Sequence, residues 1–156
     1  MQALVHKLEA ELLPKLKRQC ASLQHDQRFA RVAVVSDSGP HPPFSGPNSY
    51  IWRLDCHSPT DRADWTRLSL QVAMIFAGAE VTLQGMVLWY FARSPGELPP
   101  SGREYSTRQI IGVPDVSVTG FLSELPALFK AFEEAVARGR PKTLPNKSLQ
   151  ATATAP

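Results

Sequence analysis

Apolar and polar residues alternate strictly along residues 68–92, in two runs that flank Gly78. Alternation with a period of two is typical of a strand with one buried face. A glycine followed by another residue suits a two-residue type II′ turn, because glycine adopts a positive φ without steric cost. If Gly78 and Ala79 form that turn, the apolar residues of both runs share one face, opposite one another in the pairs Phe76–Val81, Met74–Leu83, Leu70–Val87 and Leu68–Trp89. We therefore predict a β-hairpin, in which Gly85 lies opposite Val72 and marks a bulge or bend.

Two other structures fit parts of this segment. A membrane span needs about 20 uninterrupted apolar residues, and Gln71, Glu80 and Gln84 interrupt the run, so we exclude it. A helix over residues 61–77 would have one apolar face, with Gly78 as its stop signal. We favour the hairpin because its register explains both halves of the segment at once.

Further strands are predicted on both sides of the hairpin. Residues 50–57 alternate again, and their apolar side chains join the same face in the pairs Cys56–Leu68, Leu54–Leu70 and Trp52–Val72. Residues 29–36 are short and β-branched, and residues 103–113 carry charges that suit an edge strand. Three segments have the composition of loops: residues 37–49, 58–65 and 93–102.

A helix is predicted at each end of the chain. Residues 2–24 carry an apolar stripe, which Pro14 interrupts, so either this helix kinks or two shorter helices meet there. The helix serves either as a cover for the sheet or as the contact surface of a homodimer. Residues 121–138 have the clearest stripe, with Ser123 as the N-cap and Gly139 as the C-terminal stop.

These elements predict a single α+β domain over residues 1–139. It would hold an antiparallel sheet of about five strands, with the N-terminal and C-terminal helices packed on one face. A chain of 156 residues is long enough for one domain with a substantial core.

The basic character of the chain is concentrated at its end. Lysine and arginine number 17 against 14 acidic residues, for a net charge of +3, and three of the basic residues, Arg140, Lys142 and Lys147, lie in the tail. The remaining body is neutral, which argues against a broad phosphate-binding surface and therefore against a nucleic-acid partner. The tail, residues 140–156, has little apolar surface to bury, so we predict that it is disordered.

The sequence also indicates a compartment. The N-terminus has no basic patch followed by an apolar run, so we expect no signal peptide. The two cysteines, Cys20 and Cys56, do not form a disulfide framework. We therefore expect a cytoplasmic protein that does not associate with a membrane, and we predict no cofactor.

The last residues of the chain, NKSLQATATAP, carry a resemblance. They resemble the translated ends of hypothetical proteins from the mobile gene cassettes of bacterial integrons. The resemblance implies a bacterial accessory gene of unassigned function, and it identifies neither a fold nor an activity. It also implies that the tail has no role of its own.

The polar face of the predicted strands holds the best candidates for a ligand-binding site: Arg53, Asp55, His57, Arg67, Ser69 and Tyr90. A sheet that is covered by helices on one side leaves its other face open to water. These residues therefore form either a solvated face with cross-strand charge pairs or a pocket in a curved sheet. In a pocket, His57 would act as an acid or base, and Arg53 or Arg67 would contact an anion.

The segment Asp55–His57 holds residue types that occur in catalytic and metal-binding sites. Successive strand residues face opposite sides, so Cys56 and His57 cannot form a dyad by adjacency. Asp55 and His57 share a face and would need Asp61 or Asp64 to bind a metal, but no recognised ligand spacing is present. We therefore predict neither a metal site nor a catalytic residue.

No phosphate loop or nucleophile motif is found in the sequence. We expect a small non-enzymatic binding or protein-interaction domain, of the immunity or antitoxin kind that accessory genes often encode. The alternative is a small-molecule binder or small enzyme that uses the polar face, and a third hypothesis, RNA binding, is disfavoured by the neutral body. A deep pocket beside His57 would favour the second hypothesis, and a flat open face or hydrophobic edge would favour the first.

Overall fold

The computed structural model describes residues 2–41, 44–59, 64–92, 101–112 and 118–142. The elements along the chain are α1 (Gln2–Leu23), β1 (Arg31–His41), β2 (Phe44–His57), β3 (Trp65–Ala77), β4 (Glu80–Phe91), β5 (Ser101–Gly112), α2 (Thr119–Leu122) and α3 (Leu125–Arg138). The predicted tail lies outside the described residues from position 143 onward.

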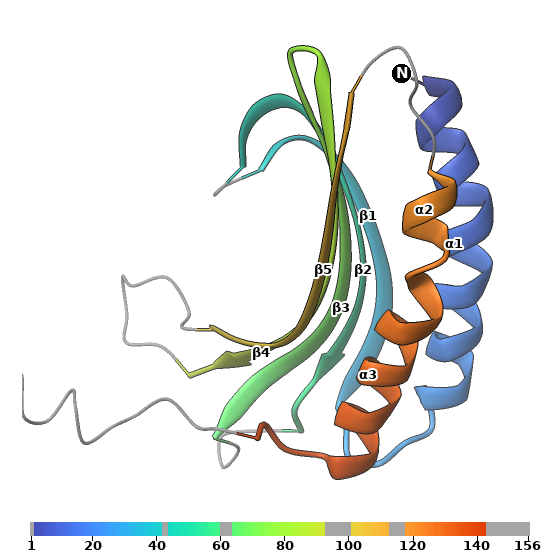
Figure 1. Ribbon diagram of the computed structural model, residues 1–156. Helices are drawn as coiled ribbons and strands as arrows, with labels where there is room; N and C mark the ends of the chain where they lie inside the picture. Colours follow the sequence, from blue (N-terminus) through green and yellow to red (C-terminus); the bar gives the residue numbers. More distant parts are fainter. Residues whose placement is uncertain (1, 42–43, 60–63, 93–100, 113–117, 143–156) are drawn as a thin grey trace, which may run out of the picture.

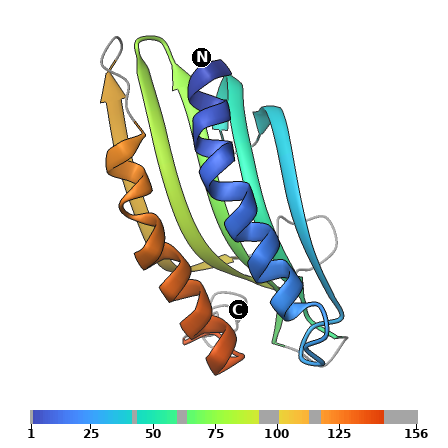
Figure 2. The ribbon, with the colours of Figure 1, turned by 90° about the vertical axis from the view of Figure 1, so that its right-hand side faces the viewer.

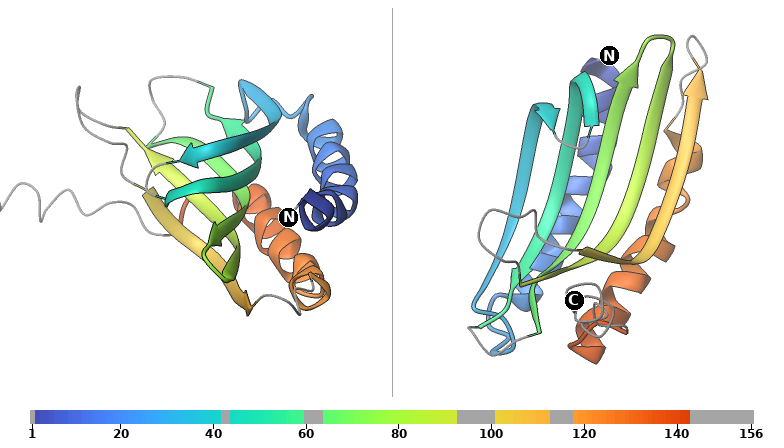
Figure 3. Two further views of the ribbon diagram at one scale, coloured as in Figure 1. Left: turned by 90° about the horizontal axis from the view of Figure 1, so that it is seen from above. Right: turned by 90° about the vertical axis from the view of Figure 1, so that its left-hand side faces the viewer.

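The five strands form one antiparallel sheet in the order β1-β2-β3-β4-β5, so strands that follow one another in the chain are also neighbours in the sheet. Figure 1 shows that the sheet is bowed and that α1 and α3 both lie against its convex side. Figure 2 shows the two helices side by side on the sheet, running roughly along the strands. The α+β class and the placement of both helices on one face are therefore confirmed. The opposite face, here called the concave face, carries no helix of the described chain (Figure 3).

The predicted hairpin is confirmed in its register. Gly78 and Ala79 join β3 to β4, and Gly78 has a φ of 60°, as a glycine-led turn requires. The four predicted apolar pairs between β3 and β4 all occur, and so do the three predicted pairs between β2 and β3. The rival helix over residues 61–77 is excluded, because Trp65–Ala77 is a strand.

Apolar side chains of both helices pack against the convex face. α1 contacts β1 and β2, and α3 contacts β3, β4 and β5. The predicted stripe of α1 is buried at Val5, Leu8, Leu12, Leu16 and Leu23. Trp52 and Trp89 belong to this core, as predicted, and each donates its indole N–H to a glutamate, Trp52 to Glu9 at 3.0 Å and Trp89 to Glu104 at 3.1 Å.

Pro14 does not divide the N-terminal helix. α1 is one continuous helix with Pro14 inside it. The proline removes one backbone hydrogen bond, but Leu12 and Leu16 on either side of it are both fully buried against the sheet. We infer that this packing holds the two halves of the helix in line.

The predicted loop over residues 37–49 is wrong. β1 continues to His41 and β2 begins at Phe44. Pro40 lies in an edge strand where the register shifts, and Pro47 precedes the point, at Asn48, where β2 begins to pair with β3. Proline is tolerated at edges and bulges because its missing N–H is not required by a neighbouring strand there.

Most residues of the other two predicted loops, 58–65 and 93–102, lie outside the described chain. Ser101 and Gly102 belong to β5 and not to a loop, whereas residues 93–100 and 60–63 lie outside the described chain. Val113, the last residue of the strand predicted over residues 103–113, also lies outside it.

The single helix predicted over residues 121–138 is instead two helices, α2 and α3. Ser123 is not the N-cap of α3, because its Oγ donates to the carbonyl of Gly120 at 2.6 Å and so closes α2. Glu124 precedes α3 and makes no capping bond with its side chain. Gly139 ends α3 with a φ of 72°, as predicted.

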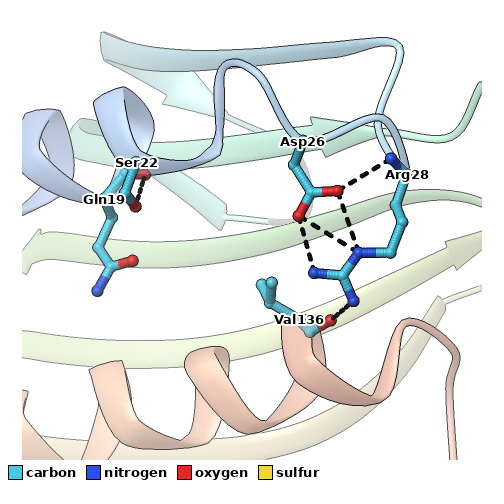
Figure 4. A network of polar contacts seen from close by, with 5 residues as sticks. All are labelled: Gln19, Ser22, Asp26, Arg28 and Val136. Carbon is cyan, nitrogen blue, oxygen red and sulfur yellow. Dashed lines mark hydrogen bonds and ion pairs between the residues drawn. The ribbon is translucent and has the colours of Figure 1, made fainter.

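The link between α1 and β1 is tied to the end of α3 (Figure 4). Arg28 donates from Nη1 to the carbonyl of Val136 at 2.7 Å, and from Nη2 to Asp26 at 2.7 Å. A cation is favourable at the carboxyl end of a helix, where backbone carbonyls lack partners. The side-chain hydrogen bond from Arg28 lowers the pKa of Asp26. Asp26 thus holds the guanidinium that caps the C-terminal helix.

Gly85 lies opposite Val72 as predicted, but it is not at a bulge, so that part of the prediction is wrong. It pairs regularly with Val72 and Thr107, and the register shift of β4 lies farther on, between Val87 and Leu88. A Cβ on Gly85 would come within 2.8 Å of Leu128 Cδ2. The close approach of α3 to β4 therefore explains the glycine.

We expect Gly85→Val to lower the free energy of unfolding by about 2 kcal/mol, because fully buried Leu128 has little room to move aside. Urea denaturation measures this. Leu128→Ala in the same chain makes room, so the double variant should lose less stability than the two single losses combined. Gly112→Val is the control, since a Cβ at Gly112 would meet nothing within 4 Å. Strict additivity of the Gly85 and Leu128 changes would show that this contact is not the cause.

Candidate functional site

The strand register brings the six predicted site residues to one end of the concave face. Across β2 and β3, Asp55 pairs with Ser69, His57 pairs with Arg67, and Arg53 is the next residue on the same face of β2. β4 adds Tyr90, which pairs with Arg67.

Arg31 of β1 pairs with His57 and joins this group, although the sequence analysis did not include it. Extending the alternation of residues 50–57 to a register for the preceding strand would have found it. We call Arg31, Arg53, Arg67, Asp55 and His57 the arginine cluster.

Asp55 is the centre of the arginine cluster. Its side chain is 4% exposed, and Arg53 Nε donates to its Oδ2 at 3.2 Å. Fully buried Ser69 donates from Oγ to the other carboxylate oxygen at 2.6 Å. Arg67 Nη1 lies 4.0 Å from Asp55 Oδ2. One buried carboxylate therefore orients two arginines.

The concave face is not a uniformly solvated surface. Its buried side chains include Ile51, Ala73, Met86 and Leu88, none of which belongs to the core beneath the helices, together with Asp55, Ser69 and Gln71. A bowed sheet draws the side chains of its concave face together, which accounts for their burial (Figure 1). Arg53 and Arg67 remain 29% and 25% exposed. The prediction of an open polar face therefore holds for the arginines and is wrong for Asp55 and Ser69.

Arg67 is fixed from one side by an aromatic ring. Its guanidinium carbon lies 4.0 Å from the centre of the Tyr90 ring, a favourable cation–π distance. Its Nε is buried and has no acceptor among the described residues. A buried N–H donor that lacks an acceptor is rare, because leaving it unpaired is costly. Arg67 is thus held in place, and its Nε–H is a donor that no described residue satisfies.

His57 is neutral at neutral pH. Burial lowers its pKa below 6.5, and the positive charge of Arg31 lowers it further. Arg31 Nη2 lies 3.0 Å from His57 Nε2. Since arginine can only donate, Nε2 is the acceptor, and the ring proton is on Nδ1. This contact occupies the lone pair that a general base would need.

Cys56 does not extend the site. It is fully buried in the core on the opposite face, where burial raises the pKa of its thiol to about 12, so the thiol stays protonated. Cys56 and His57 lie on opposite faces, as predicted. Within the described chain no group of three or more His, Cys, Asp or Glu residues is suited to hold a metal ion. Asp61, one of the ligands considered above, lies outside that part.

Two cavities lined by described residues lie away from the arginine cluster. One, of about 320 Å³, lies between α1 and the strands β1 and β2 and includes Glu9 and Trp52. The other, of about 210 Å³, includes Trp89, Arg103 and Lys142. Neither includes His57.

Comparison of the chain with protein-family models, with curated proteins and with solved structures gave no match. None of the helices described has both the length and the apolar character that crossing a membrane requires. A proposal for the function therefore rests on the arginine cluster of the concave face.

Proposed function

We propose that this protein is a non-enzymatic interaction domain whose arginine cluster binds acidic groups of a partner protein. The observation that carries the proposal is the charge of the cluster, which has three arginines and a single carboxylate, Asp55; of the three arginines, Arg53 and Arg67 lie within 4.0 Å of that carboxylate. Two of them, Arg53 and Arg67, keep about a quarter of their surface exposed. The planar donor fork of arginine matches a carboxylate, so acidic side chains are suitable ligands.

One feature supports a protein partner over a small molecule. Arg53 and Arg67 keep about a quarter of their surface exposed at one end of the concave face, where acidic side chains of another protein can reach them. The resemblance of the tail implies a bacterial accessory gene, and an immunity or antitoxin role, which such genes often encode, would suit a partner-binding protein. Both cysteines are free thiols, in keeping with the reducing cytoplasm that we expect.

One observation favours the alternative, a small-molecule binder or small enzyme. His57 is a neutral imidazole among three arginines, an environment that would suit a substrate anion. Its Nε2 already accepts a hydrogen bond from Arg31, however, so proton transfer at that atom would first require Arg31 to move. This contact is why we rank the alternative second.

The proposal is tested with an octaglutamate peptide, whose binding to the full chain is measured by isothermal titration calorimetry at low and high salt. We expect binding that weakens with salt. Arg67→Ala should weaken it by about tenfold, because a hydrogen bond to a charged group contributes roughly 1.5 kcal/mol or more. Arg53→Ala should act in the same direction.

Arg18→Ala is the matched control, since Arg18 is an exposed arginine of α1 on the other side of the molecule. This variant should bind octaglutamate with the affinity of the wild type. Octaglutamine, which has no charge, should not bind measurably to the wild type. Equal affinity in all three variants would refute a role for the arginine cluster. Thermal unfolding of each variant shows that it is folded.

A further inference from the structure

The edge strand β1 lacks the protection that the other edge strand, β5, has. β5 carries the exposed Arg103 and Arg108, and charges of this kind discourage strand pairing between molecules. β1 has no charged residue between Arg31 and Asp37. The intervening apolar residues are only half buried, and no strand of the described chain lies beyond β1. An unpaired edge of this length is a template for another strand.

Only the C-terminal end of β1 has features that prevent pairing with a strand of another molecule. The register with β2 shifts between Gly39 and His41, around Pro40. A bulge and a proline both end strand pairing. The segment open to a partner is therefore Arg31–Asp37.

This segment is self-complementary in charge. If two copies pair antiparallel about Val34, Arg31 of each lies opposite Asp37 of the other, and the apolar residues between them meet one another. Arg31 and Asp37 lie on the concave face, opposite His57 and Ile51 of β2. A register shifted by two residues would place Arg31 opposite Gly39 or Val35 and lose both charge pairs. Opposite charges in cross-strand positions stabilise a register, and like charges oppose it.

The side chains on the convex side of β1 also suit this pairing. Val32 and Val34 pack against the edge of the core and are half buried. Val34 would lie opposite its own copy on the two-fold axis and Val32 opposite Ser36, so the partner strand would cover the valines. Pairing of identical strands about a two-fold axis is isologous, and therefore closes at two subunits.

We propose that the protein forms a homodimer in which β1 pairs antiparallel with β1 of a second copy, in the register that places Arg31 opposite Asp37. The two sheets become one continuous sheet, with all four helices α1 and α3 on the same side. The proposal rests on the edge of the sheet and does not depend on the proposed acidic ligand.

The test is the molar mass of the full chain, without any ligand, by sedimentation equilibrium over a range of concentrations. The wild type should have twice the mass of the 17.2 kDa chain. The dimer has two Arg31–Asp37 pairs, so Asp37→Arg or Arg31→Asp replaces both of them by pairs of like charges. Each single variant should therefore raise the dissociation constant of the dimer on the order of tenfold or more. The double variant, Arg31→Asp with Asp37→Arg, recreates both pairs and should restore the dimer.

Two further variants separate this interface from others. Val35→Lys adds a lysine to the centre of the edge and should give a monomer. Arg108→Asp makes a charge reversal on β5 and should leave the dimer intact. Circular dichroism confirms that each variant is folded. A wild type that is monomeric at every concentration, or a double variant that dissociates as readily as the single ones, would overturn the proposal.

Discussion

Phe132→Ala should lower the free energy of unfolding by about 4 kcal/mol, the largest effect we expect from a single substitution. Phe132 is fully buried in α3. α3 covers β3, β4 and β5, whereas α1 covers the other half of the sheet. Removing the ring therefore leaves a cavity under the helix that covers three of the five strands, and rigid strands collapse into such a space only in part.

Equilibrium urea denaturation measures this loss as a shift in the midpoint. Phe132→Leu keeps most of the volume and should cost less than about 1.5 kcal/mol. Lys130→Ala, on the exposed side of the same helix, should stay within about 0.5 kcal/mol of the wild type. A loss for Phe132→Ala as small as that for Lys130→Ala would contradict the placement of α3 on the sheet.

Asp55→Ala should change stability and ligand affinity in opposite directions. Removing the carboxylate leaves Arg53 without its hydrogen-bond acceptor and buried Ser69 without the oxygen to which it donates. We expect a loss of about 2 to 3 kcal/mol, below the full cost for a wholly buried pair because the arginines are partly exposed. The affinity for octaglutamate should rise several-fold, because the internal anion no longer competes for the arginines.

Asp55→Asn separates these two effects. The amide keeps an oxygen that can accept from Ser69, so most of the stability should remain, while the negative charge is lost. Its affinity for octaglutamate, measured by calorimetry, should rise as much as that of Asp55→Ala. An Asp55→Asn variant that binds the peptide no better than the wild type would show that Asp55 and the ligand do not share the same arginines.

The hairpin could be predicted from the sequence because two independent signals agree. The period-two pattern places the apolar residues of both strands on one face, and a glycine with positive φ at position 78 fixes the register between them. Once this register was known, residues 50–57 could be paired with β3, and the shared face of Arg53, Asp55 and His57 followed.

The parts that were not predictable depend on more than one strand. Proline and glycine around positions 40 and 47 are typical of a turn when read locally. Pro40 is tolerated in a strand because β1 is an edge strand, and Pro47 is tolerated because it precedes the residues of β2 that pair with β3. Arg31 was missed because it reaches the arginine cluster only through the register of β1. The burial of Asp55 follows from the bowing of the whole sheet, which no single segment encodes.

The order of the strands has a consequence for synthesis on the ribosome. Each strand pairs with the one made just before it, so the sheet can assemble as the chain emerges. The apolar side of its last strands stays uncovered until α3, which follows all five strands, has been made. During that interval Leu83, Val87 and Trp89 face water, the condition under which nascent chains aggregate or recruit chaperones. Nascent chains that stall before α3 are therefore the species that chaperones and proteases would encounter.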